Sequence, residues 1–251
     1  GCVYSEKSIY TKAMEHFLEA DNNAEQTKNT KLKALVKTET GKLYYKKNLP
    51  DSAIVYYKEA LQLYTRIDST EKQQSQLMHI IAINYSMNKE FNEALFYNNK
   101  ALQLTKLTHD STLEVRIMNS LAVIYREIGN YKSSKSMLFN VLRHKRLSSS
   151  LKENAYLNIA KDYYYEDNMD SAFYYVNLIA PAVDERNNYF KLNYHKFIYE
   201  LYAKTDNCIE AIEHQKLYHE YRIKITDKER ADALVQAEKE YQLSEKEKQL
   251  V

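Results

Sequence analysis

The sequence predicts an all-α protein built from five helical hairpins, with one helix leading into them and one following them. A tyrosine recurs along the chain at spacings of 41, 40, 38 and 39 residues. Only three glycines and two prolines occur in 251 residues, too few for the tight turns of a many-stranded protein. Hydrophobic residues make up 44% of the chain, enough to bury a core. Self-similarity at this period is typical of helical solenoids.

Small residues recur at fixed distances from the repeat tyrosine, in four of five units at the first position and in all five at the second. The repeat tyrosines are Tyr44, Tyr85, Tyr125, Tyr163 and Tyr202. Three residues earlier stand Gly41, Ala82, Ala122, Ala160 and Tyr199, and nine residues later stand Ala53, Ala94, Ser134, Ala172 and Ala211. Seven residues further on stand Ala60, Ala101, Val141, Ile179 and Tyr218. Small residues let two helices approach closely and the tyrosine fills the adjacent space, so we expect the repeat tyrosines to be mostly buried.

Two helices are expected in each unit, joined where turn-forming residues cluster. These short turns are predicted at residues 48–51, 88–90, 129–130, 167–168 and 206–207. Because each turn is short, the paired helices must run antiparallel. Capping boxes predict the helix starts between units, and they pair Asp68 with Glu71, Ser111 with Glu114, and Ser150 with Glu153.

The pattern of a small residue, a tyrosine three residues on and two further small sites resembles the tetratricopeptide repeat. The best matches are Gly41 to Ala60, with Tyr57 at the expected aromatic position, and Ala82 to Ala101. The period exceeds the usual 34 residues, the closing proline is absent, and the early aromatic is replaced by Lys37, Met78, Met118, Tyr156 and His195. The resemblance covers roughly residues 8 to 225. It implies a right-handed α–α superhelix, and the lengthened repeats are similar to the sensor regions of membrane-tethered bacterial regulators.

The ends of the chain differ from the repeats. Residues 1–27 are predicted to form a half repeat or cap, in which Ala13, Phe17 and Ala20 match the second helix of a unit and Glu15, His16 and Glu19 face away. Five repeats follow at 28–225, and a charged helix at 226–251 leads into further sequence. The capping box Thr226 to Glu229 predicts the start of that helix. Its thin seam of Leu234, Ala237, Tyr241 and Val251 fits either a helix lying over the last repeat or the start of a coiled coil.

Composition and motifs give no support to catalysis or to nucleic-acid binding. The net charge is +2, with no global field to attract a polyanion. No metal-type cysteine spacing, phosphate loop or nucleophile motif occurs, and we expect no enzyme activity, metal or cofactor. His214 and His219 are interpreted as packing or solvated histidines, and the acidic cluster at 162–170 as helix caps.

The expected ligand surface is the concave groove that the first helix of each unit lines in tetratricopeptide proteins. Carried onto this sequence, the candidate groove residues are Lys42, Tyr45, His79, Arg116, Asn119, Arg126, Asn154, Lys161, Tyr164, Asn193 and Lys196. Basic and amide side chains prevail, so we expect this surface to hold a peptide's carboxylate or acidic side chains, with the tyrosines as contact platforms. An ordinary solvated face is the alternative interpretation. The specific chaperone-tail clamp cannot be placed on these residues.

The chain begins Gly1-Cys2, which fits either a cloning remnant or the junction of a bacterial lipoprotein with Cys2 acylated. The leading hypothesis is a non-enzymatic module that binds a protein or peptide and serves as the sensor region of a membrane-tethered, extracytoplasmic or periplasmic regulator. Its membrane attachment would be through an N-terminal lipid or a downstream transmembrane helix. The alternative is a structural scaffold or surface lipoprotein without signalling output, and a cytoplasmic location is the alternative to the envelope.

Overall fold

The computed structural model describes residues 2–145 and 147–249, in which the regular elements are all helices. The chain divides into two compact units. The N-terminal unit comprises residues 12–155, and the C-terminal unit comprises residues 156–251 with the first eleven. The predicted all-α fold class is confirmed.

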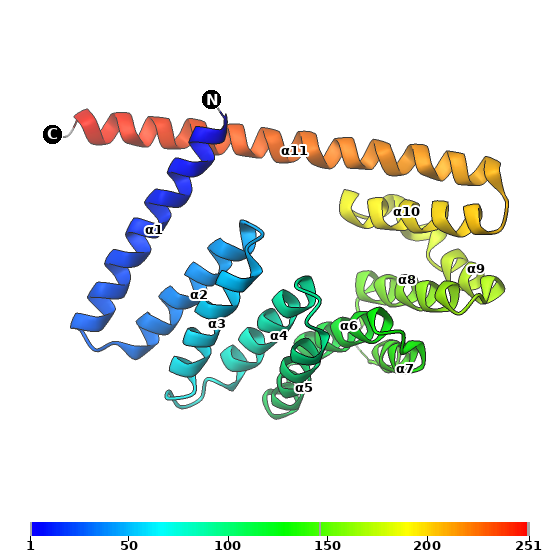
Figure 1. Cartoon of the computed structure of the whole chain (residues 1–251), viewed down its shortest axis with the longest axis horizontal. Helices are drawn as coiled ribbons and strands as arrows, with labels where there is room; N and C mark the ends of the chain where they lie inside the picture. Colours follow the sequence, from blue (N-terminus) through cyan, green and yellow to red (C-terminus); the bar gives the residue numbers. More distant parts are fainter. Residues whose placement is uncertain (1, 146, 250–251) are drawn as a thin grey trace. The chain divides into compact units, whose positions relative to one another are not determined.

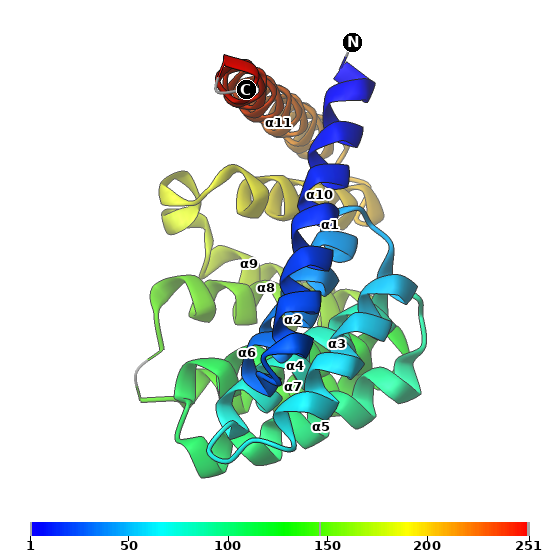
Figure 2. The same cartoon turned by 90° about the vertical axis from the view of Figure 1, so that its left-hand side faces the viewer.

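The N-terminal unit contains most of a leading helix and three antiparallel hairpins (Figures 1 and 2). The leading helix α1 spans Cys2–Gln26. The hairpins are α2 (Thr30–Lys46) with α3 (Pro50–Tyr64), α4 (Glu71–Met87) with α5 (Phe91–Thr108), and α6 (Ser111–Glu127) with α7 (Tyr131–Leu142). Successive hairpins pack through α3 against α4 and through α5 against α6. This stacking sets the first helices α2, α4 and α6 in consecutive order.

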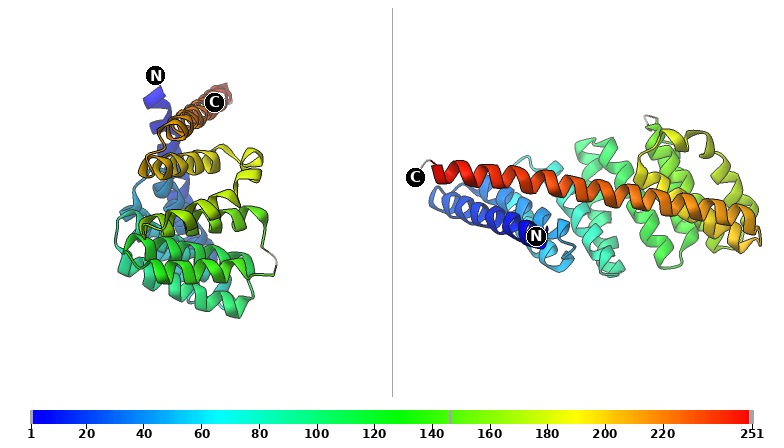
Figure 3. Two further views of the ribbon diagram at one scale, coloured as in Figure 1. Left: turned by 90° about the vertical axis from the view of Figure 1, so that its right-hand side faces the viewer. Right: turned by 90° about the horizontal axis from the view of Figure 1, so that it is seen from above.

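The C-terminal unit holds the fourth and fifth hairpins. Helix α8 (Ser149–Tyr165) begins in the N-terminal unit and pairs with α9 (Met169–Asn177), which a short 3₁₀ helix η1 (Ala180–Glu185) follows. The fifth hairpin joins α10 (Asn188–Lys204) to α11 (Cys208–Gln249), which Figure 3 shows as one unbroken helix. The predicted capping box at Thr226 is therefore wrong, and the Thr226 hydroxyl instead donates to the Arg222 carbonyl inside the helix. No glycine or proline interrupts 208–249, so nothing in the sequence stops the helix.

The seam predicted beyond Thr226 is only partly described. Leu234 is 66% exposed. The side chains of Ala237 and Tyr241, and residue Val251, lie outside the described residues. The choice between a docked helix and a coiled coil stays a prediction.

The five predicted hairpin turns are confirmed, and all have the same geometry. The residue four after each repeat tyrosine is left-handed, with φ between 56° and 77°. These residues are Asn48, Lys89, Gly129, Asp167 and Asp206. The next residue's N–H donates to the carbonyl of the repeat tyrosine, at 2.8 to 3.1 Å. This hydrogen bond, which runs back over five residues, closes a Schellman turn. It satisfies a carbonyl left unpaired at the end of the first helix.

The predicted helix starts lie close to the observed ones, but the capping residues are different. Asp110, one residue before the predicted Ser111, accepts from the Leu113 N–H. Ser148 takes this role for α8, two residues before Ser150. Thr70 precedes α4 in place of Asp68, and its hydroxyl donates to the Tyr64 carbonyl instead of capping. Of these three helices, α6 and α8 therefore begin where a side chain accepts from a free backbone N–H, and α4 begins without such a cap.

The repeat tyrosines pack between paired helices, as predicted. Tyr85 is buried, the other four are half-buried, and the small residues around them are almost fully buried. The residue twelve after each repeat tyrosine stacks on it in four hairpins, a pairing that the sequence reasoning missed. The stacked pairs are Tyr44 with Tyr56, Tyr85 with Tyr97, Tyr163 with Tyr175, and Tyr202 with His214.

The glycine of the first hairpin is required by its partner's size. A Cβ on Gly41 would lie 2.7 Å from the ring of Tyr57, which is 1% exposed. In the second and third hairpins the equivalent pairs are Ala82 with Asn98 and Ala122 with Leu138. A larger side chain on α3 is therefore accommodated by a smaller one on α2.

The leading helix is tied to the first hairpin by charge. Lys37 lies 3.0 Å from Asp21 of α1 and 3.2 Å from Glu59 of α3. Glu15, His16 and Glu19 are exposed, as expected for the outer side of a cap. Phe17 and Ala20 are half-buried, and the side chain of Ala13 lies outside the described residues.

Candidate functional site

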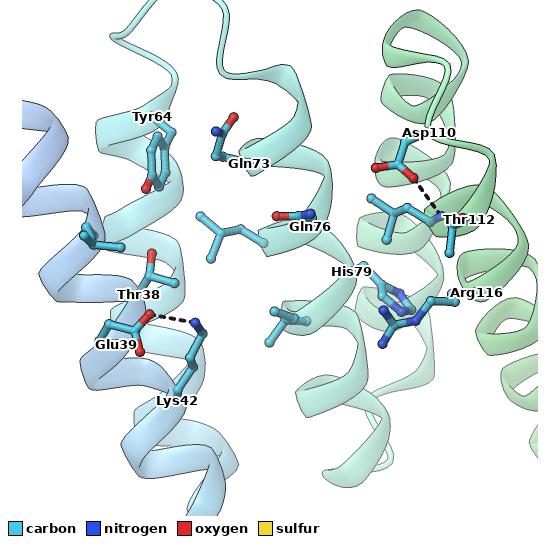
Figure 4. Close-up of a pocket in the computed structure, with 14 residues that line it drawn as sticks. Thr38, Glu39, Lys42, Tyr64, Gln73, Gln76, His79, Asp110, Thr112 and Arg116 are labelled. Atoms are coloured by element: carbon cyan, nitrogen blue, oxygen red, sulfur yellow. Dashed lines mark hydrogen bonds and ion pairs between the residues drawn. The ribbon is translucent and has the colours of Figure 1, made fainter.

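A pocket lies in the N-terminal unit, across the first helices of its three hairpins (Figure 4). It measures about 560 Å³, within the usual range of small-ligand sites. Helix α4 supplies the middle of the pocket, and α2 and α6 supply its two sides. Its lining residues are Leu35, Thr38, Glu39, Lys42, Tyr64, Gln73, Gln76, Leu77, His79, Ile80, Asp110, Thr112, Leu113 and Arg116.

Most charges in this pocket are already paired. Lys42 lies 2.6 Å from Glu39 on α2, and Asp110 lies 3.3 Å from Lys72. The N–H of Leu113 and then Lys72 hold the pKa of the Asp110 carboxyl below its usual range, so this residue stays ionised. The Lys42 and Glu39 side chains are 48% and 38% exposed, and such a surface pair is worth little. A ligand carboxylate could replace Glu39 as the partner of Lys42.

Arg116 is an exposed cation of the pocket and lies beside His79 (Figure 4). Within the described part of the chain, no carboxylate forms an ion pair with it. His79 is 6% exposed, and its Nδ1 lies 2.9 Å from Oδ1 of Asn98. Burial lowers the pKa of His79, and the Arg116 charge lowers it further against the opposing hydrogen bond of Asn98. At neutral pH His79 is therefore uncharged, and Arg116 provides the positive charge.

The remaining surface is apolar and amide-rich. Leu35 is 49% exposed, while Leu77, Leu113 and Tyr64 present the edges of buried side chains. Gln73 and Gln76 lie three residues apart on α4, and Figure 4 shows both facing the space between α2 and α6. Each amide both donates and accepts hydrogen bonds, as a peptide backbone requires. The pocket therefore combines an apolar patch, neutral hydrogen-bonding groups and one cation without an ion-pair partner.

Only some of the predicted groove residues line this pocket. Lys42, His79 and Arg116 line the pocket together. Tyr45 is 42% exposed and does not line it. Asn119 and Arg126 follow Arg116 on α6 but turn inward: Arg126 is 9% exposed, and the buried Oδ1 of Asn119 finds no hydrogen-bond partner in the described part of the chain.

The other candidates lie on α8 and α10. Asn154 donates to the Ser150 carbonyl within its own helix. In the C-terminal unit, Lys161 lies 5.7 Å from the ring centre of Phe197, and Tyr164 makes an edge-on contact with the same ring. Asn193 and Lys196 are exposed on α10. A ligand-binding role for these residues stays a prediction.

The sequence analysis missed two of the three residues that occupy one repeat position and line the pocket. Leu35, Gln76 and Arg116 each stand nine residues before a repeat tyrosine, and all three line the pocket. Only Arg116 was singled out, because the lining positions of the first two units were taken one turn too late. Carrying the position of Arg116 back through the repeat would have found Leu35 and Gln76.

Two further observations bear on other kinds of site. Among the described residues, no group of three or more histidine, cysteine, aspartate or glutamate side chains could hold a metal ion. No described helix combines the length and the apolar character that a bilayer crossing requires.

The sequence matches no protein-family profile and no curated protein. Solved structures do share its fold. BtubC from P. vanneervenii has a TM-score of 0.66 at 15% identity, over 86% of this chain and 91% of that one. The apo form of RapI has a TM-score of 0.68 at 16% identity, over 88% and 72%. The Rap conjugation gene regulator of the plasmid pLS20, in complex with the Phr* peptide, has a TM-score of 0.59 at 16% identity, over 88% and 71%.

At these identities the similarity shows the fold alone. The chain has the fold of tetratricopeptide-like helical repeat proteins, in agreement with the resemblance of its repeat.

Proposed function

We propose that this chain is a non-enzymatic interaction module that binds an extended peptide segment in the pocket across α2, α4 and α6. The observation that carries the proposal is Arg116, an exposed cation with no ion-pair partner in the described part of the chain, which projects into a pocket where the other charges are paired. A guanidinium in this setting fits a carboxylate, which it can bind through two parallel hydrogen bonds.

The rest of the pocket suits a short piece of polypeptide. Gln73 and Gln76 can hydrogen-bond to a peptide backbone, and the exposed face of Leu35 can receive an apolar side chain. A volume of about 560 Å³ holds an anchor of a few residues and not a whole domain. The expected ligand is therefore an acidic peptide segment, or a chain terminus, with an apolar residue close to its carboxylate.

A peptide ligand is consistent with the fold. The Rap conjugation gene regulator, which shares the fold, has a structure in complex with the Phr* peptide. The near-neutral net charge of +2 gives no reason to propose nucleic acid as the partner.

The proposal is tested by selecting from a random peptide library displayed with free C-termini. The wild-type chain should enrich peptides that carry an acidic residue or use their terminal carboxylate. Arg116→Glu should weaken binding of the selected peptides by at least about tenfold, since it replaces the charge-assisted bond by repulsion. Arg66→Glu makes the same charge change at an exposed position of the same unit and should bind within about twofold of wild type. Equal binding by both variants would remove Arg116 and the pocket from the proposal.

We further propose that the module is the sensor region of a membrane-tethered bacterial regulator, placed outside the cytoplasm. The support is α11, which has 42 residues where its partner α10 has 17, and whose second half is rich in charge. Such a helix suits a connector to a further module. A full reading frame with a transmembrane helix and an output domain after Val251 would support this role. Metabolic labelling of Cys2 by a fatty acid, with no downstream domain, would favour the surface lipoprotein or scaffold instead.

A further inference from the structure

One pair of positions in the repeat is filled differently in each hairpin. It joins the residue seven before the repeat tyrosine, on the first helix, with the residue twelve after it, on the second helix. The pairs are Lys37 with Tyr56, Met78 with Tyr97, Met118 with Met137, Tyr156 with Tyr175, and His195 with His214. The Lys37 ammonium lies 5.6 Å from the Tyr56 ring centre, and the rings of Tyr156 and Tyr175 are 5.9 Å apart. We call this pair of positions the slot of the hairpin. Only the fifth hairpin has two imidazoles in its slot.

The two imidazoles meet directly between α10 and α11. Nδ1 of His195 lies 2.9 Å from Nδ1 of His214. His195 is 8% exposed and His214 is half-buried. Tyr221 stacks on the His195 ring at 5.5 Å, and Tyr202 stacks on the His214 ring at 5.8 Å. The contact is therefore packed on both sides by aromatic rings from the same two helices.

A hydrogen bond between two Nδ1 atoms depends on the proton count. With both imidazoles neutral, one Nδ1–H donates to the bare Nδ1 of the other. With one added proton, the bond becomes charge-assisted and stronger. With two, both atoms carry hydrogens and both rings are positive, so the bond is lost and like charges face each other at short range.

We infer that the His195–His214 pair makes closure of the fifth hairpin dependent on pH, so that α11 separates from α10 when both imidazoles are protonated. This device is independent of the proposed peptide site. It acts within the C-terminal unit, on the helix whose long continuation extends beyond the hairpin.

The charged groups around the pair do not remove the repulsion between two protonated imidazoles. His195 is influenced by Asp184 of η1, Lys191 of α10 and Glu220 of α11, and Glu220 is itself bonded to Lys224 at 2.5 Å. Glu213 and Glu210 of α11 act on His214. The acidic groups favour a first proton on the pair. Burial and the second imidazole, followed by Lys191, oppose protonation of His195.

The lowered pKa values of the two histidines decide how the stability of the fifth hairpin changes with pH. Burial, and then His214, lower the pKa of His195 to about 4, and burial lowers the pKa of His214. The unfolded imidazoles have the ordinary pKa of 6.5. Because the folded pair binds fewer protons than the unfolded chain, its stabilising contribution is full above the unfolded value. The contribution is lost as the pH falls from there toward 4.

The experiment is amide hydrogen exchange of the whole chain, expressed as protection factors, at about pH 7.5 and about pH 4.5. In the wild type, amides of α10 and of the first half of α11 should lose about tenfold or more of their protection at the lower pH. Amides of α9 should change less. At the higher pH, ¹⁵N spectra should show one of the two imidazoles as the Nδ1–H tautomer, as the contact requires.

The other hairpins provide residue pairs that can replace the two histidines. His195→Tyr with His214→Tyr copies the fourth hairpin and should abolish the excess loss of protection at low pH. If that variant does not fold, His195→Met with His214→Met copies the third hairpin and tests the same point. His219→Tyr changes an exposed histidine of α11 outside the pair and should respond to pH like the wild type. Equal acid response in the wild type and a folded pair variant would overturn the inference, as would full protection of the wild type at low pH.

Discussion

In the first hairpin, the slot between the two helices holds Lys37, bridged to Asp21 and Glu59 and set over the ring of Tyr56. In the fifth, the same slot holds His195 and His214. Burial acts to lower the pKa of Lys37, but its bonds and charges with the two carboxylates outweigh this and raise it. The first contact is therefore stable below the ordinary lysine pKa of 10.5 and is lost only as the pH rises through the folded value. The fifth is lost in acid.

The two hairpins also differ in how their helices fit. The first sets the smallest residue, Gly41, against the fully buried Tyr57. The fifth has Tyr199 and Gln215 at these positions, both half-buried. One backbone unit thus accepts a tightly packed pair or a looser, partly solvated one. The first hairpin should tolerate change least, and the fifth should be the easier one to open.

The largest expected effect is in the first hairpin. Tyr57→Ala should destabilise the chain by about 3–5 kcal/mol, because it removes a buried ring and leaves a cavity between α2 and α3. Gln215→Ala at the equivalent position should cost less than about 1 kcal/mol. Urea unfolding followed by far-UV circular dichroism measures both. Similar costs for the two variants would show that the contrast in packing does not exist.

A second test concerns the match in size. Gly41→Ala should destabilise by about 1–3 kcal/mol, since the new Cβ overlaps the Tyr57 ring. In a Tyr57→Leu background, which copies Ala122 with Leu138, the same change should instead stabilise by up to about 1 kcal/mol, as alanine favours a helix over glycine. The two unfolding experiments form a double-mutant cycle. A Gly41→Ala effect of the same sign in both backgrounds would refute the size argument.

The role of Lys37 in the first slot can be tested with the residue that other hairpins have at this position. Lys37→Met, the residue of the second and third hairpins at this position, should cost about 1–2 kcal/mol near neutral pH, because it leaves the carboxylate of Asp21 without its cation. The difference from wild type should shrink above the lysine pKa, where the wild type loses the same charge. Unfolding measured at neutral and at alkaline pH checks this. A cost that does not depend on pH would mean that Lys37 acts through its aliphatic chain alone.

The repeat itself could be predicted from the sequence, and the contacts between helices only in part. Tyr44 and its counterparts, the small residues around them and the turns all follow from one local pattern with a fixed period. The stacking of Tyr56 on Tyr44, and the meeting of His195 with His214, depend on how two helices face each other across a turn. Helical spacing within one element does not give that relation, and His214 was accordingly interpreted as an ordinary histidine. Three of the predicted groove residues, Lys42, His79 and Arg116, line the pocket, but the extent of the pocket depends on how three hairpins stack.

The smallest expected effect is at the turns, where the hairpins are most alike. Asp206 of the fifth hairpin has a φ of 58°, and Gly129 holds the same turn position in the third. Asp206→Gly should stabilise by a few tenths to about 1 kcal/mol, because glycine adopts this conformation without strain. Gly129→Ala should destabilise by about 1 kcal/mol through the backbone alone, since a Cβ there meets nothing within 4 Å. Urea unfolding of both variants gives the two signs. A stabilising Gly129→Ala would show that the turns do not share the left-handed geometry that unites the five hairpins.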